Sequence, residues 1–259
     1  MLSHQSLDSR RPRFLRDVVG NAHVVGRLVQ QMANGTDPQR AFLLGPTGSG
    51  KTTVAQIMVR HRFCRNRSGI GDPCGVCDRC LGSLEDLTDY EEWTGARLDA
   101  DWGWWERNGS SILRRPWASI FIDEAQDLSE RHQKTLFRDL EGATCQVIFA
   151  TTHKSHIKDA LLKRFGNNIY EMRRPTVPEV TDHLTSICTA LGIRAETAEL
   201  TNVAELNGCD LRLCVDFVYS AAEQAPNQVV TAAFVESVFG VAAASEEAKV
   251  TSCTSRLRL

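Results

Sequence analysis

The stretch that decides the fold is Gly45-Pro46-Thr47-Gly48-Ser49-Gly50-Lys51-Thr52-Thr53, which matches the phosphate-binding pattern G-x-x-x-x-G-K-[ST] at every defined position. Residues 41–44 before it form an apolar run typical of a short buried strand, and residues 52–59 after it have the pattern of a helix. Strand, glycine-rich loop and helix in this order direct backbone N–H groups at a phosphate. A fortuitous glycine-rich turn is the alternative, and the flanking elements disfavour it.

Each residue type in this loop suits binding of a nucleoside triphosphate. The glycines let the backbone wrap around the phosphates, Lys51 is expected to reach the β- and γ-phosphates, and the Thr52 hydroxyl is expected to coordinate Mg²⁺. The predicted nucleotide-binding residues of the loop are Gly45, Gly48, Ser49, Gly50, Lys51, Thr52 and Thr53.

A second motif follows another apolar run, residues 117–122, which we expect to be a buried strand ending at Asp123-Glu124. A carboxylate at the tip of a parallel strand beside a phosphate loop holds Mg²⁺ in such folds, which is the role expected of Asp123. Glu124 suits the base that polarises the attacking water. A polar helix cap would explain one carboxylate but not this pairing with the loop, so the sequence predicts triphosphate hydrolysis.

Further elements predict a parallel α/β sheet. Residues 146–150 read as a third buried strand, and Thr152 just beyond it could orient the lytic water. Residues 161–165 indicate a helix that contains Arg164, and residues 169–170 suggest a short fourth strand. Strands that alternate with helices in this way form parallel sheets with right-handed crossovers.

Four of the nine cysteines cluster directly after the predicted loop helix, with the spacing C-x9-C-x2-C-x2-C. Four thiolates this close in sequence can surround one tetrahedral Zn²⁺. Four free surface thiols are the alternative. A site with four protein ligands leaves no open position for water, so the predicted zinc is structural. The expected ligands are Cys64, Cys74, Cys77 and Cys80.

The segment from Leu81 to Arg115 is acidic and then aromatic, and its pattern is ambiguous. Trp102, Trp104 and Trp105 lie almost together beside acidic residues. Exposed tryptophans could bind a partner or stack on bases, whereas the simpler interpretation folds them back onto the domain.

A change of character at 173–178, where two prolines fall within four residues, divides the chain. We expect a P-loop nucleotide-binding domain over residues 1–173 with a zinc module at about 64–80. An all-helical domain is expected over 174–240, followed by a flexible tail over 241–259.

The net charge of −2 gives no global signal for nucleic acid, so any DNA contact would be local. No segment reads as a membrane span or signal peptide, which favours a cytoplasmic protein without membrane partners.

The layout of a P-loop α/β domain followed by a small helical domain resembles the AAA+ ATPases, and more closely the gamma/tau clamp-loader ATPase subunit of bacterial DNA polymerase III. The resemblance covers about Arg11 to Gly240. It rests on the opening that runs from Arg11-Pro12 to Asp17-Val18-Val19-Gly20, on the inserted four-cysteine module, and on Asp123-Glu124 followed by Leu128-Ser129. Gln126 stands where that family has histidine.

The resemblance implies roles for further residues. It makes ATP the nucleotide, with Val19 among the residues that bind it, and it makes Thr152 the sensor 1 residue that detects the γ-phosphate. Arg164 occupies the position of the arginine finger, although the flanking serine and cysteine of the family motif are replaced here. Arg212, in Gly208-Cys209-Asp210-Leu211-Arg212, resembles sensor 2, which places it in a helical lid.

The function implied is that of an ATPase working in an oligomer of AAA+ subunits on DNA, with a sliding clamp or polymerase subunits, in replication or repair. The chain ends about where that family's helical collar domain would begin. This ending and the tryptophan-rich segment favour the alternative, an ATP-dependent assembly switch or scaffold of a phage, mobile-element or defence system. A helicase or branch-migration motor is a weaker one, which the cysteine module disfavours.

Overall fold

The computed structural model describes residues 11–67, 69, 71–224 and 229–239, and the tail predicted at 241–259 lies outside these residues. The chain separates into two compact units, Met1–Arg174 and Pro175–Leu259. In the described residues, no helix is long and apolar enough to cross a membrane.

The first unit is built on a five-stranded sheet in the order β2-β3-β4-β1-β5, in which every neighbouring pair is parallel. This arrangement confirms the predicted α/β fold class. Because the strands are parallel, all of their carboxyl ends lie at one edge of the sheet and all of their amino ends at the other. The strands are β1 Arg40–Leu44, β2 Tyr90–Thr94, β3 Ser119–Asp123, β4 Gln146–Thr151 and β5 Ile169–Glu171.

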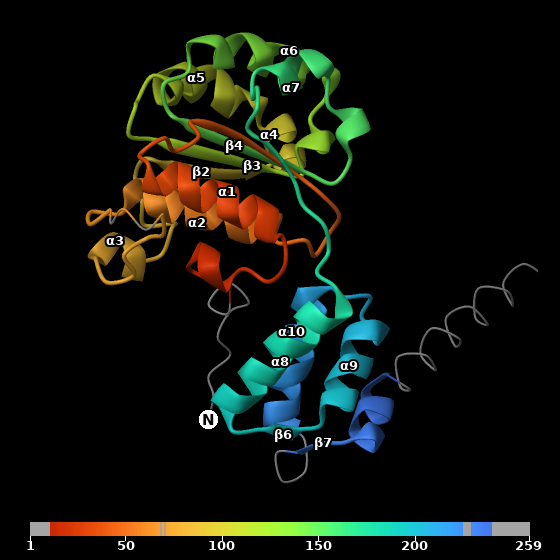
Figure 1. Cartoon of the computed structure of the whole chain (residues 1–259). Coiled ribbons are helices and arrows are strands. Elements are labelled where there is room, and N and C mark those ends of the chain that lie inside the picture. Colours follow the sequence, from red (N-terminus) through yellow and green to blue (C-terminus); the bar gives the residue numbers. More distant parts are fainter. Residues whose placement is uncertain (1–10, 68, 70, 225–228, 240–259) are drawn as a thin grey trace, which may run out of the picture. The chain divides into compact units, whose positions relative to one another are not determined.

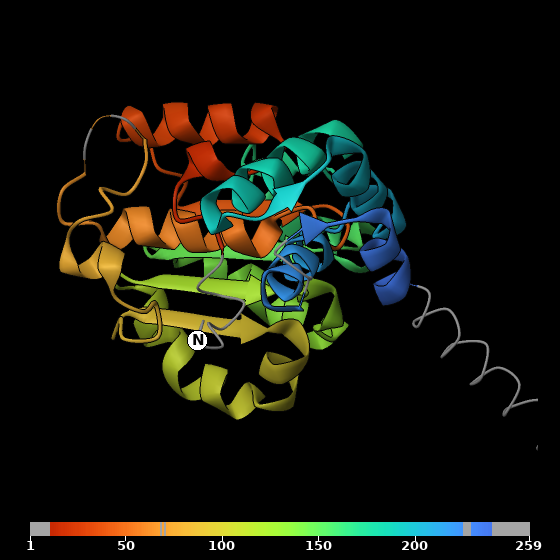
Figure 2. The ribbon, with the colours of Figure 1, turned by 90° about the horizontal axis from the view of Figure 1, so that it is seen from below.

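Helices cover both faces of the sheet, as buried parallel strands require (Figure 1). On one face α1 (Ala22–Ala33) and α2 (Lys51–Phe63) enclose a core with alternate strand residues such as Leu43 and Phe121. Figure 2 shows α2 running along the strands. On the other face, Phe42 and Ile120 pack in the core that α5 (Trp102–Leu113) and α6 (Glu130–Asp139) cover.

The first unit contains further helices. The α-helices are α3 Asp78–Leu81, α4 Gly95–Ala100, α5 Trp102–Leu113, α6 Glu130–Asp139 and α7 Asp159–Lys163. The 3-10 turns are η2 Leu15–Asp17, η3 Ala125–Asp127, η4 Leu140–Gly142 and η5 Lys154–His156.

Two expectations about the strands are corrected. The ambiguous segment contains β2, which pairs with β3 in register from Tyr90 opposite Ser119 to Thr94 opposite Asp123. The short strand near residue 169 is therefore the fifth and not the fourth. The strand before Asp123 begins at Ser119, and Trp117, which was expected inside it, is 61% exposed in the preceding loop.

The tryptophan segment is part of the core, so the hypothesis of an exposed partner surface is wrong for its two buried members. Trp102 and Trp105 are buried in α5. Trp102 stacks on the His132 ring at 3.8 Å between centroids, and Trp105 Nε1 donates to Asp139 Oδ2 at 2.8 Å. Both contacts attach α5 to α6.

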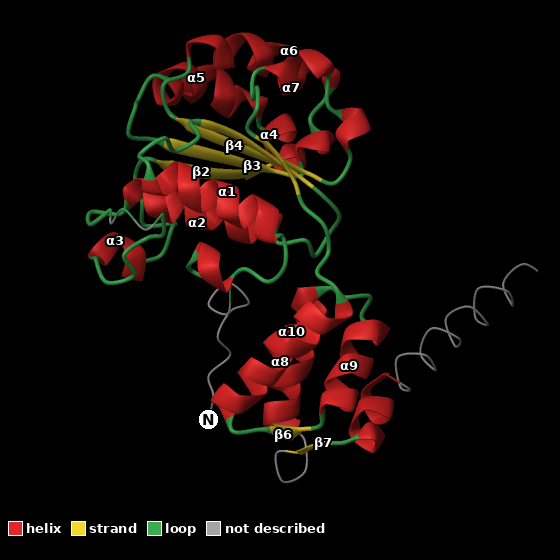
Figure 3. Cartoon of the chain, in the orientation of Figure 1, coloured by secondary structure: helices red, strands yellow, loops and turns green. Residues whose placement is uncertain are grey.

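The second unit is mainly helical (Figure 3). It contains α8 Val177–Leu191, α9 Thr197–Leu206 and α10 Leu211–Gln224, and residues 232–239 are also helical. Thr176 caps α8, and its backbone N–H and its hydroxyl both donate to Glu179 Oε2, at 2.7 and 2.9 Å. An all-helical unit was expected, but β6 (Arg194–Ala195) and β7 (Val229–Val230) form a short parallel pair. The helix α9 accordingly begins only after β6, at Thr197.

Candidate active site and metal centre

The phosphate loop leaves β1 and enters α2 at Lys51. Gly48 and Gly50 have φ angles of 79° and 91°, a region that residues with a Cβ avoid. At Gly45 a Cβ would lie 2.3 Å from the carbonyl oxygen of Met172. The glycines that match the motif are therefore required by the backbone path as well as by phosphate chemistry.

Lys51 is buried at the base of this loop. Its Nζ donates to the carbonyl oxygens of Gly45 at 2.8 Å and Pro46 at 3.1 Å. Burial lowers the pKa of Lys51, and the nearby carboxylates of Glu124 and Asp123 act in the opposite direction. The ammonium group thus lies inside the curve of the loop, where phosphate oxygens could replace the two carbonyls as its partners.

Thr52 and Asp123, the two expected magnesium ligands, are in direct contact. The Thr52 hydroxyl donates to Asp123 Oδ2 at 2.6 Å, while the other carboxylate oxygen of Asp123 accepts from the backbone N–H of Glu124 at 2.8 Å. Hydroxyl and carboxylate oxygens are hard ligands of the kind Mg²⁺ takes in proteins. The chain therefore brings a suitable pair of donors together beside the phosphate loop.

Glu124 belongs to a hydrogen-bonded group on the neighbouring strand tips. Its Oε2 accepts from Gln126 Nε2 at 2.6 Å and from the Thr152 hydroxyl at 3.3 Å. Gln126 Oε1 accepts in turn from the Thr151 hydroxyl at 2.5 Å and from the Thr152 backbone N–H at 3.3 Å. Because β4 lies between β1 and β3, Thr152 stands between the phosphate loop and Asp123-Glu124.

Gln126 had no role in the sequence-based site. The sequence showed only that Gln126 stands where the resembled family has histidine. It did not show that the Gln126 side chain would connect Glu124 to the end of β4. Gly95 was also missed. A Cβ at Gly95 would lie 2.4 Å from the carbonyl oxygen of Glu124, so the first turn of α4 packs tightly against the backbone of the expected base.

Asn21 is a third residue that the sequence did not reveal. Its backbone is left-handed, with φ at 55°. The side chain donates to Ser49 O at 3.2 Å and to Arg173 O at 2.9 Å, and accepts from Arg173 N at 2.7 Å. It therefore ties the phosphate loop to the end of the first unit, and it follows the half-buried Val19 by two residues.

Of the two candidate arginines, Arg164 does not join this hydrogen-bonded group, and Arg212 belongs to the second unit. Arg164 follows the last residue of α7, where its Nε donates to Phe137 O at 3.1 Å and its Nη2 lies 3.3 Å from Glu141 Oε1. Its guanidinium also lies over the Phe137 ring at 4.1 Å. Arg212 is exposed in the first turn of α10, in the second unit.

The predicted cysteine ligands converge on one point. Sγ atoms of Cys64, Cys74, Cys77 and Cys80 all lie within 4.8 Å of one another, a spacing that tetrahedral Zn²⁺ coordination requires. Backbone N–H groups support the sulfurs: that of Cys74 donates to Cys64 Sγ and that of Cys77 to Cys74 Sγ, both at 3.3 Å. The donor set therefore fits a structural zinc.

The cysteine module is fastened to the rest of the unit by contacts around it. Asp72 Oδ1 accepts from the Leu15 backbone N–H at 2.5 Å. A Cβ at Gly75 would meet the Phe14 ring at 2.6 Å. Arg60, on α2, donates to the carbonyls of Cys80 and Gly82 at 3.3 and 3.0 Å. The module therefore contacts both α2 and the segment that contains Phe14 and Leu15.

Comparison with known proteins places these features in a family. Residues 41–172 match the family described as ATPase family associated with various cellular activities (AAA). The chain is 25% identical over 240 residues to the DNA polymerase III subunit tau of Salmonella typhimurium, which covers 90% of this chain and 37% of that protein. It is 24% identical over 220 residues to the replication factor C small subunit of Methanocella arvoryzae, covering 82% of this chain and 61% of that protein. The resemblance to gamma/tau subunits is thereby confirmed, and the chain spans little more than a third of the tau subunit's length.

Among solved structures, RuvB of Thermotoga maritima, described as a Holliday junction branch migration motor, superposes with a TM-score of 0.67 at 19% identity. The match covers 89% of this chain and 72% of that one. Domain III of the Thermotoga maritima replication initiation protein DnaA gives a TM-score of 0.58 at 18% identity, covering 86% of this chain and 94% of that one. At these identities the likeness establishes the fold alone.

Proposed function

Because this chain belongs to the AAA family of ATPases, we propose that it works as one subunit of an ATP-driven, clamp-loader-like assembly that acts on DNA in replication or repair. The two kinds of relative described above are named as a DNA polymerase III subunit and a replication factor C subunit. The site geometry supports the ATPase part of this proposal, and the relatives' names support the part that concerns DNA.

The observation that carries the proposal is the 2.6 Å hydrogen bond from Thr52 to Asp123. It joins the two motifs that ATP hydrolysis needs, although they are far apart in the chain. In the proposed complex Gly45, Gly48, Ser49, Gly50 and Thr53 cradle the phosphates with Lys51, next to the segment that contains Val19. Thr52 and Asp123 would hold Mg²⁺, which would neutralise part of the negative charge of the phosphates.

The carboxylate of Glu124 would accept the proton of the attacking water. Its hydrogen bonds with Gln126 and Thr152 fix the orientation of that carboxylate, so these two residues position the base. Thr152 would in addition detect whether the γ-phosphate is present. Preorganised groups of this kind need no reorganisation during the reaction, which is a main source of rate enhancement.

We propose that Arg164 acts in trans, on ATP bound to a neighbouring subunit, and that Arg212 contributes from the helical lid, residues 174–240. A guanidinium suits both roles because it is always charged and donates in a planar fork. In the single chain the Phe137 carbonyl and Glu141 hold the Arg164 side chain, so reaching a neighbour requires at least one of these contacts to be exchanged.

The role proposed for the module at about 64–80 is structural. Zinc held by Cys64, Cys74, Cys77 and Cys80 would supply a cross-link between the end of α2 and the segment around α3. All four protein ligands would be used, so no hydrolytic role is assigned to the metal.

The test of the proposed function is the ATPase rate as a function of protein concentration. An arginine finger contributes about 10³–10⁵ in related reactions, so the rate per subunit should rise steeply as subunits associate. Separately, Arg164→Ala and Glu124→Gln should each be inactive, while their mixture should recover activity at mixed interfaces. A monomer as fast as the associated protein would exclude the role of Arg164 in trans.

The partners are tested by co-purification with a sliding clamp and with polymerase subunits. The alternative of an assembly switch drew support from the tryptophan segment, and the burial of Trp102 and Trp105 removes that support. Recovery of a clamp would favour the clamp-loader proposal. Nucleotide-dependent oligomers that recover neither clamp nor polymerase would favour the switch.

A further inference from the structure

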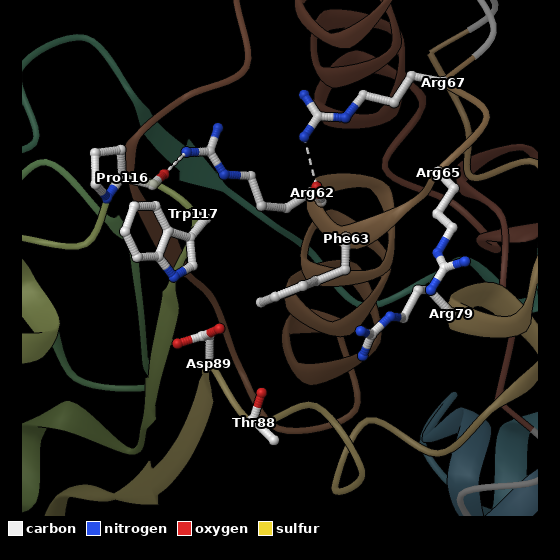
Figure 4. Close-up of a pocket in the computed structure, with 9 residues that line it drawn as sticks. All are labelled: Arg62, Phe63, Arg65, Arg67, Arg79, Thr88, Asp89, Pro116 and Trp117. Carbon is white, nitrogen blue, oxygen red and sulfur yellow. Dashed lines mark hydrogen bonds between the residues drawn. The ribbon is translucent and has the colours of Figure 1, made fainter.

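A cavity lies outside the ATP site. It has a volume of about 510 Å³ and is lined mainly by arginine and aromatic side chains (Figure 4). Its lining includes Arg62, Phe63, Arg65, Arg67, Arg79 and Trp117. They come from the end of α2, the chain that follows it, α3 and the loop before β3.

The position of this cavity separates it from the nucleotide. Thr88 and Asp89 line it just before the start of β2, and Trp117 lines it just before the start of β3. The cavity therefore lies at the amino edge of the sheet, whereas Asp123 and Thr152 stand at the carboxyl edge. A ligand here would not touch the residues assigned to ATP.

Four guanidinium groups line this cavity, which favours an anionic ligand. Arg62 donates to the Pro116 carbonyl, and Arg67 donates to the Arg62 carbonyl at 2.5 Å, so the backbone holds two of them in place. Burial, together with the charge of Arg67, lowers the pKa of Arg62. Like charges are thus held close together.

The carboxylates nearby cancel only part of this charge: Asp37, whose side chain is 9% exposed, lies 3.5 Å from Arg67 Nη1. Arg65 pairs with Asp78 at 3.0 Å, but both side chains are more than half exposed, and such pairs are weak. Asp89, the acidic residue of the lining, is already paired with Arg115 at 3.3 Å. Within the part of the chain that the structure describes, Arg79 has no carboxylate within ion-pair distance.

Trp117 gives the cavity a second chemical character. With 61% of its surface exposed, it is among the large apolar side chains that the fold leaves in solvent. An indole beside guanidinium groups matches the combination by which proteins hold single-stranded nucleic acid, with bases stacked on aromatic rings and phosphates on cations.

We propose that this cavity binds a short single-stranded segment of nucleic acid, with one base stacked on Trp117 and the adjacent phosphates held by Arg62, Arg65, Arg67 and Arg79. A base paired within a duplex does not offer its face to the indole, which favours a single strand. An acidic peptide would satisfy the arginines but leaves the indole without a stacking partner. The proposal concerns a site independent of ATP and does not rest on the proposed function.

The experiment is a fluorescence anisotropy titration of the full, zinc-loaded chain without ATP, using labelled (dT)10. Trp117→Ala should weaken binding about tenfold, since stacking on an aromatic side chain contributes ~1–3 kcal/mol per base. Arg79→Ala should weaken binding and reduce the slope of log K against log salt by about 0.7, the value for one phosphate contact on a single strand. Arg194→Ala, an exposed arginine of the second unit, is the charge-matched control and should change neither quantity.

Two further probes distinguish the chemistry of the ligand. An abasic strand of ten phosphates should depend on Arg79 but not on Trp117. A (rU)10 strand tests whether the site prefers DNA or RNA, and pocket-dependent binding of either supports the proposal. Equal affinity of Trp117→Ala and the parent chain for (dT)10, with both folded by thermal melting, would overturn it. So would a deca-glutamate peptide that binds as tightly as (dT)10.

Discussion

The two edges of the sheet in the first unit differ in how their polar side chains are satisfied. At the carboxyl edge functional side chains bond to one another, as Thr52 does to Asp123 and Gln126 to Glu124. At the amino edge the arginines donate to backbone carbonyls or pair with carboxylates of differing exposure, as Arg62 does with Pro116, Arg65 with Asp78 and Arg67 with Asp37.

This difference has a chemical meaning. Side chains that bond to one another have fixed orientations, which a reaction step requires, and they leave little freedom for a change of ligand. Arginines held by backbone carbonyls keep their charge and their remaining donors, which suits binding of an anion of variable sequence. The carboxyl edge is therefore built for chemistry and the amino edge for binding, and each can be impaired separately.

Glu124→Gln is expected to show the largest difference between the functions of the two edges. Loss of the base should lower the ATPase rate by about 10³, because general-base catalysis contributes ~10²–10⁴, whereas ATP binding and (dT)10 binding without ATP should stay unchanged. Steady-state phosphate release and nucleotide titration measure the two effects. Glu106→Gln, at an exposed position on α5, is the matched control. A fall in (dT)10 binding would show that the edges are coupled.

Removal of the metal should damage the amino edge alone. Cys77→Ser takes away one ligand of the predicted zinc, and the module that supports Arg79 should loosen, at a cost of roughly 3 kcal/mol and thus about 6–12 °C in Tm for a domain of this size. Zinc content by mass spectrometry, the melting curve and (dT)10 binding are the measurements. ATP binding should persist. Cys209→Ser lies outside the cluster and should retain the zinc. A variant that melts like the parent would argue against a metal at this site.

The sequence predicted the carboxyl edge much better than the amino edge. The phosphate loop and Asp123-Glu124 at the carboxyl edge could be predicted because each is a local pattern with one chemical use, and at the amino edge this holds for the cysteine cluster alone. β2 was not predicted because Glu91 and Glu92 interrupt the apolar pattern. An edge strand tolerates such charged residues, since its outer side has no neighbouring strand. The buried tryptophans were ambiguous because aromatic residues beside acidic ones occur in cores and on surfaces alike.

What the sequence could not show are contacts between distant residues. Asn21 reaches both Ser49 and Arg173, and Gln126 reaches Thr151, pairings that depend on the order of strands in the sheet. The arginine cavity likewise combines the end of α2, residues within the module and the loop that contains Trp117. No spacing rule connects such residues before the fold is known.

Gln126→Ala tests whether Gln126 positions Glu124 at the carboxyl edge, and a moderate loss of ATPase activity is expected. Without the amide, Glu124 loses its 2.6 Å donor and its connection to Thr151, so kcat should fall about tenfold, the effect of about 1.4 kcal/mol of lost positioning, while KM for ATP changes little. Gln126→His is the conservative variant, because histidine stands there in the resembled family, and it should retain more activity than alanine. An alanine variant whose main defect is a raised KM would assign Gln126 to ATP binding instead.

The smallest effect is expected from Asp37→Asn, which tests the amino edge through pH. Asp37 Oδ2 lies 3.4 Å from His61 Nδ1 and 3.5 Å from Arg67 Nη1. Burial acts to raise the pKa of Asp37, but His61 and the arginines prevail and hold it below its ordinary value. A depressed carboxyl pKa stabilises the fold above the unfolded pKa near about 4, and this stabilisation is lost as pH falls through the folded value.

The substitution should therefore lower the free energy of unfolding by about 1 kcal/mol at pH 7 and by progressively less below pH 4, as followed by urea unfolding at several pH values. The exposed Asp86→Asn is the control and should change stability little at any pH. A difference between Asp37→Asn and the parent that is as large at pH 3 as at pH 7 would mean that the side chain acts by packing and not by charge. Arg67 would then owe its place to the Arg62 carbonyl alone, and (dT)10 binding by Asp37→Asn would be unchanged from that of the parent.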